Sequence, residues 1–182
     1  MSRYYYLVTT LPTLDLDQEL TITGTEFLDL CRTHLSKKDF KVISSLYDPS
    51  SGDIPIKNKT LLAWESFEQS LIHLLAEKRA EHLGLSEKET YKNTYGKTSA
   101  ITEAVRKAMA ENSPLMGEKI LDAARIVFLE DIEVTHYFDL TKLIVYSLKL
   151  AILERHQHFD FEEGNEEFKR LLSNIKTSIG SY

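Results

Sequence analysis

The chain has 182 residues, of which 42% are hydrophobic and 27% charged, a balance typical of a soluble globular protein with one domain or two small ones. Its formal net charge of −6 is the wrong sign for binding along a nucleic-acid backbone, and its single cysteine, Cys31, excludes an internal disulfide, a cysteine-rich zinc site and a redox CxxC pair. The most hydrophobic stretch, residues 140–154, is interrupted by Lys142 and Lys149 and is too short for a membrane span, so we expect a cytoplasmic protein.

The first segment is the run YYYLV at residues 4–8, which is aromatic and β-branched and is followed by Pro12. Such residues favour a strand, but no second convincing strand follows with which this one could pair. The run can be forced into a helix that ends by Thr10 or Leu11, lie extended across helices, or pair with another chain. We expect it to be buried against the C-terminal helices.

Two short helices are predicted next. Thr23 and Glu26 have the spacing of a capping box, which starts the first helix and takes it to about His34. Ser36 and Asp39 form a weaker start for the second helix.

Residues 48–60 contain prolines, a glycine and several turn formers, which are typical of an exposed connection. We therefore expect a single all-helical domain in which a linker over 48–60 separates a smaller N-terminal unit, 1–47, from a main bundle, 61–182.

The main bundle begins with a long amphipathic helix that runs from about Leu61 to a C-terminal cap at Gly84. A short helical turn is predicted at Ser86, a helix follows over 101–110, and Ser113 with Pro114 starts the next one.

Asp139 caps the following helix, which is apolar around nearly its whole circumference and is therefore expected at the centre of the fold. A terminal amphipathic helix begins near Asn165 and carries an apolar stripe, formed by Phe168, Leu171, Leu172 and Ile175. The predicted fold class is all-α, a bundle of about six to eight helices. It begins with a short N-terminal apolar segment whose conformation the sequence leaves undecided.

Motifs for catalysis are weak. The string GKTS at residues 96–99 resembles the end of a phosphate-binding loop, but Tyr91 stands where the first glycine is needed and no strand precedes the loop. We interpret GKTS as a loop and helix N-cap. Cys31 lies in an apolar helix pattern and is expected in the core, while His156 and His158 fall on different faces of a helix. We therefore predict a protein that is not an enzyme and uses no cofactor.

The stretch FLEDIEVTHYFDL, residues 128–140, places acidic and aromatic side chains around a turn between two helices. Either the turn is solvated and its aromatics plug the core, or it is an exposed acidic and aromatic contact for a protein partner. A di-iron site would need a second E-x-x-H motif. The candidate interface residues are Glu130, Glu133, His136, Tyr137 and Asp139.

Three motifs carry a resemblance that extends along most of the chain. They are YYYLV with LP close behind, F-L-D-L before L-S-K-K-D at residues 27–39, and HYFDL before a long apolar helix that ends LERHQHFD. Their order and spacing resemble a family of bacterial proteins encoded beside V-type (A-type) ATPase subunits.

This resemblance implies a non-catalytic accessory or central-stalk subunit of a V-type ATPase or ATP synthase, a machine that transports protons or sodium ions. Its partners would be the stalk or membrane-ring subunits, at the cytoplasmic face of the inner membrane. A place like that of the C/d component, the helical funnel between the shaft and the membrane ring, is implied more weakly. Funnels of the archaeal type contain three similar helical units, and this chain shows no repeat. The alternatives are a transient ATPase assembly factor and a small helical metal-binding enzyme built on Glu130, Glu133 and His136.

Overall fold

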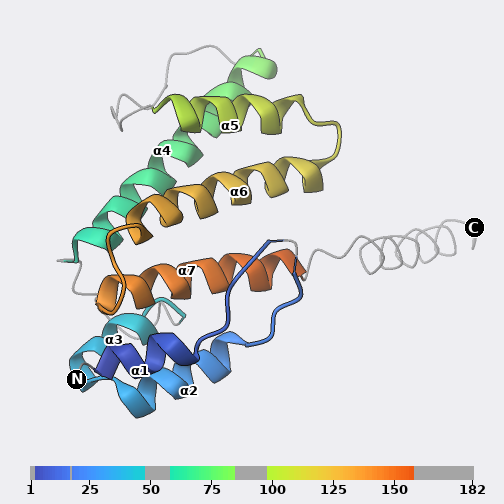
Figure 1. Ribbon diagram of the computed structural model, residues 1–182. Helices are drawn as coiled ribbons and strands as arrows, with labels where there is room; N and C mark the ends of the chain where they lie inside the picture. The colour runs from blue at the N-terminus through green and yellow to red at the C-terminus, as the bar shows by residue number, and fades with distance from the viewer. Residues whose placement is uncertain (1–2, 17, 48–57, 85–97, 158–182) are drawn as a thin grey trace, which may run out of the picture.

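The computed structural model describes residues 3–16, 18–47, 58–84 and 98–157 (Figure 1). These residues form seven helices and no strand, which confirms the predicted all-α bundle. None of these helices combines the length and the apolarity that a membrane crossing requires. The helices are α1 (Arg3–Thr10), α2 (Gly24–His34), α3 (Lys37–Ser44), α4 (Lys59–His82), α5 (Ser99–Ala110), α6 (Pro114–Glu133) and α7 (Leu140–Gln157).

Some predictions fall outside the described residues. These are most of the linker over 48–60, the turn at Ser86, the glycine and lysine of GKTS, and the terminal helix from Asn165. The division of the chain at the linker stays a prediction. The other helices lie close to their predicted bounds.

The run YYYLV is helical, the first of the three alternatives, and α1 ends at Thr10 as the nearby proline predicts. Leu7 is fully buried, but Tyr5 and Tyr6 are 53% and 59% exposed. Successive residues on a helix point about 100° apart, so three consecutive tyrosines cannot share one buried face. The expected burial is therefore right for Leu7 and wrong for Tyr5 and Tyr6.

Local capping sets the helix starts. The Thr23 hydroxyl accepts a hydrogen bond from the Glu26 N–H, and the Glu26 carboxylate accepts one from the Thr23 N–H, so the capping box is confirmed. Thr98 accepts from the Ile101 N–H at the start of α5, which confirms the N-cap reading of the end of GKTS. Pro114 is the first residue of α6.

Helix α7 lies between the N-terminal helices and α6 (Figure 1) and contacts α1, α2, α3, α4 and α6, so its predicted central position is confirmed. It takes part in a core with α1 to α3, whose fully buried members are Leu7, Phe27, Cys31, Ile43, Leu143, Ile144 and Leu150. Helices α4, α5 and α6 pack around a second core, whose buried side chains are Phe67, Leu71, Leu74, Ile101, Val105 and Leu121.

Cys31 belongs to the first core, as predicted, and is fully buried. Burial raises the pKa of the Cys31 thiol to about 12. At neutral pH the side chain is therefore a protonated, packed thiol and not a nucleophile.

A buried ion-pair network joins α4, α6 and α7. Asp122 is 1% exposed, and its Oδ1 accepts from Arg125 Nη1 at 2.8 Å and from Arg155. Arg125 Nε in turn donates to Glu68 at 2.8 Å, and His156 Nδ1 lies 3.7 Å from Asp122 Oδ2. Charges this deep in a protein are tolerated only when they are paired, so the network fixes how these three helices meet.

The first turn of α2 is held against α7 by one side chain. The Glu154 carboxylate accepts from the Gly24 N–H at 2.5 Å, where the positive end of the α2 dipole also favours a negative charge. A Cβ at Gly24 would lie 2.6 Å from Cε1 of Tyr47. This close approach requires glycine.

Candidate functional site

The turn between α6 and α7 is tightly capped. The Asp139 carboxylate accepts from the Lys142 N–H at 3.0 Å, which confirms Asp139 as the cap of α7, and its Oδ2 lies 2.5 Å from His136 Nδ1. Burial raises the pKa of Asp139, but the His136 and Lys142 hydrogen bonds outweigh it, so the pKa is below its ordinary value. The turn therefore presents its side chains from a fixed backbone.

Glu133, the last residue of α6, faces two lysines of α7. One carboxylate oxygen accepts from Lys142 Nζ and the other from Lys149 Nζ at 2.5 Å. Glu130 Oε1 lies 3.5 Å from the same Lys149 Nζ. Glu133 and both lysines line a cavity of about 270 Å³ beside residues 11–14. The two positive charges of the lysines are balanced by the two negative charges of Glu133 and Glu130.

Burial raises the pKa of Glu133, but the hydrogen bonds from Lys142 and Lys149 outweigh it and lower the pKa below the ordinary 4.5. A carboxyl with a lowered folded-state pKa stabilises the protein above its unfolded pKa, and this stabilisation is lost as pH falls through the folded value. We expect Glu133→Gln to lower the free energy of unfolding by about 1 kcal/mol at pH 7, a small value because water screens the half-buried pair. The variant should also lose less stability than the wild type between pH 5 and 3.

Urea unfolding at several pH values measures this effect. Glu65→Gln is the matched control, because Glu65 is exposed on α4. The ion-pair account is wrong if both variants follow the wild-type pH profile.

The three residues considered for a metal site are occupied by other partners. Glu130 and Glu133 both contact Lys149, and the His136 ring pairs with Asp139. Within residues 3–16, 18–47, 58–84 and 98–157, no three His, Cys, Asp or Glu side chains are grouped as metal ligands. The geometry favours ion pairs and a helix cap at this turn.

The aromatic side chains of the turn are exposed. Tyr137 is 68% exposed and Phe138 43%, so neither plugs the core. The Phe138 ring lies 4.8 Å from the Tyr5 ring, centroid to centroid, and the Tyr6 ring lies 4.9 Å from that of His34 on α2. The start of α1 lies beside the start of α7 (Figure 1). We call Tyr5, Tyr6, Tyr137 and Phe138 the aromatic surface.

Helix α1 brings together motifs that are far apart in the sequence, at this surface and beside it. The Tyr4 hydroxyl donates to Asp39 Oδ2 at 2.9 Å, which connects YYYLV to L-S-K-K-D. Burial and this hydrogen bond raise the pKa of Tyr4 to about 12. The contact between Tyr5 and Phe138 connects YYYLV to HYFDL. Parts of all three motifs that carry the family resemblance are therefore in contact with one another through α1.

The five predicted interface residues take different places. The side chain of Glu130 is 57% exposed and Tyr137 is also open to solvent. His136 and Asp139 pair with each other and keep partial exposure, while Glu133 is turned toward the lysines. The prediction omitted Tyr5 and Tyr6, although three consecutive tyrosines on one helix already require some exposure.

The family described as "Protein of unknown function (DUF2764)" matches residues 1–51 and 66–179 of the chain. The match includes all three motifs on which the resemblance depends. No curated protein and no solved structure matches the chain.

Proposed function

The chain belongs to the DUF2764 family, and we propose that it is a non-catalytic accessory or central-stalk subunit of a V-type ATPase. It binds its partner in the ATPase through the aromatic surface. The observation that carries this proposal is the contact between two exposed rings, Tyr5 of YYYLV and Phe138 of HYFDL, because both motifs belong to the resemblance to proteins encoded beside ATPase subunits.

The composition of this patch suits a protein interface. Large aromatic side chains anchor interfaces because they bury much area with little loss of conformational freedom. Asp131 is exposed on the last turns of α6, a few residues before the turn that carries Tyr137 and Phe138, whereas the nearby Glu130 is paired with Lys149. Charges beside an interface help to select the partner, and Asp131 favours a lysine or arginine opposite it.

The fold also suits a part that transmits force. Helix α7 is packed on five other helices, and the Asp122 network connects it to α6 and α4. A protein that couples two sectors of a rotary machine has to hold its shape under load. Rigid helices with well-packed contacts meet that need.

The test is co-purification from the native organism after gentle detergent extraction. We expect the wild-type chain to co-purify with the ATPase. The amount of a Tyr137→Ser, Phe138→Ser double variant that co-purifies should be at least about tenfold lower, because interface aromatics commonly contribute about 2 kcal/mol or more. Met116→Ser is the control, since Met116 is 48% exposed at the opposite end of α6. The proposal fails if intact ATPase complexes lack the wild-type chain.

A salt series separates a permanent subunit from an assembly factor. A permanent subunit stays with the ATPase at high salt, because an aromatic interface is apolar at its centre. A chain that is released at moderate salt, or found only with partly built complexes, acts in assembly.

A further inference from the structure

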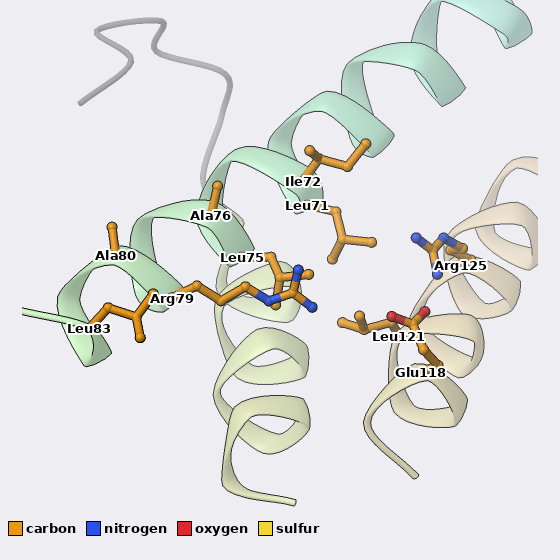
Figure 2. A pocket seen from close by; sticks show the side chains of 10 residues that line it. All are labelled: Leu71, Ile72, Leu75, Ala76, Arg79, Ala80, Leu83, Glu118, Leu121 and Arg125. Carbon is orange, nitrogen blue, oxygen red and sulfur yellow. The ribbon is translucent and has the colours of Figure 1, made fainter. Parts of the chain in front are cut away.

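A groove opens between the C-terminal half of α4 and the N-terminal half of α6 (Figure 2), with a volume of about 530 Å³. Ile72, Leu75 and Leu83 line the α4 side, and Leu121 lines the α6 side. Ile72 and Leu83 are 50% and 70% exposed. Exposed apolar side chains gathered along a groove mark a surface that binds another segment.

The end of α7 lies next to this groove. Arg125 lines the groove and shares Asp122 with Arg155, in the last turn of α7. The chain continues for 25 residues beyond α7, over 158–182. Seven extended residues, 158–164, can span about 25 Å, which is enough for the segment that begins at Asn165 to reach the side of the groove that Arg125 lines.

This following segment has the sequence of an amphipathic helix. Its apolar residues recur at positions i, i+3, i+4 and i+7, and a helix this short is unstable in water unless its apolar face is covered. As a helix, residues 165–178 would be about 21 Å long, and the α4 wall from Ile72 to Leu83 is about 17 Å long. The apolar residues are Phe168, Leu171, Leu172 and Ile175.

The charges of the two partners also match. Arg79 extends across the groove toward α6, where Glu118 also lines the groove (Figure 2), and the Arg79 guanidinium has no ion-pair or hydrogen-bond partner among the described residues. The segment carries Glu166 and Glu167 at its start, which can neutralise this guanidinium. We propose that residues 165–178 bind as an amphipathic helix in the groove between α4 and α6 of the same chain. This proposal does not depend on the ATPase assignment.

Thiol labelling of the full chain tests the proposal, because Cys31 is buried and does not react. The probe is Ile72→Cys in the groove, and the control is Val127→Cys, 55% exposed on α6 and not among the groove residues. We expect a maleimide to label Ile72→Cys at least tenfold faster when Leu171→Asp and Leu172→Asp are also present, with no change for Val127→Cys. Equal rates at Ile72→Cys in both backgrounds would overturn the proposal and leave the groove to a separate protein partner.

A disulfide test covers the case in which the double aspartate variant does not fold. A cysteine is placed in turn at each of the four apolar positions of the segment, together with Ile72→Cys or Val127→Cys. At one or more positions, mild oxidation should link the segment to Ile72→Cys within a single chain, and none should link to Val127→Cys. A covalent dimer would instead assign the groove to the segment of a second copy, and the absence of any link would also contradict the proposal.

Discussion

Replacing Asp122 with alanine should lower the free energy of unfolding by about 3 kcal/mol, because it removes the shared anion of a buried ion-pair network. Arg125 is 9% exposed and would keep only Glu68 as an ionic partner within the part of the chain that the structure describes. Arg155 and His156 would lose their ion pairs with α6 there. Urea unfolding measured by far-UV circular dichroism gives this value.

The matched control is Asp131→Ala, on the same helix but exposed. We expect this control to change the free energy of unfolding by no more than about 0.5 kcal/mol. If both alanine variants lose the same stability, the Asp122 network does not stabilise the fold.

Substitutions on the buried face of α1 should lower stability, whereas substitutions on its exposed face should weaken partner binding. Leu7→Ala should cost about 3 kcal/mol of stability, since a fully buried leucine loses both its apolar burial and its packing. Tyr5→Ser and Tyr6→Ser should leave stability nearly unchanged, because both side chains are more than half exposed. The same two tyrosine variants should weaken co-purification with the ATPase.

Deletion of residues 1–11 removes both faces at once and should destabilise the protein at least as much as Leu7→Ala. Thermal unfolding of Leu7→Ala, of the two tyrosine variants and of the deletion measures how much α1 contributes to stability. Co-purification of the same variants with the ATPase measures how much α1 contributes to partner binding. A deletion that leaves the melting temperature unchanged would show that α1 does not contribute to the core.

Sequence reasoning succeeded where a signal is local. The capping box at Thr23 and Glu26, the cap at Asp139 and the start at Pro114 each depend on residues within one turn of helix. The central place of α7 was also predictable, because a helix that is apolar on all sides has to be covered on all sides.

Sequence reasoning failed where the deciding contact is distant in the chain. The β-branched and aromatic character of YYYLV favours a strand, yet Leu7 gains full burial among α2 and α7 as a helix, and this tertiary packing outweighs the local propensity. The partners of Lys142 and Lys149 could not be read from the sequence either. Both lysines lie in a helix that looked apolar all around, and it is the approach of α6 that supplies Glu133.

The position of α7 has a consequence for synthesis on the ribosome. Helices α1 to α3 end by residue 44, but the core they share with α7 needs Leu143, Ile144 and Leu150, and the contact between Gly24 and Glu154 spans 130 residues. At about 5–20 residues per second, translation takes on the order of 5–20 s to pass from the first three helices to the end of α7. During that time Leu7, Phe27 and Ile43 have no finished core to enter. The apolar faces of α1 to α3 can therefore be covered by α7 only after residues 140–157 have been synthesised.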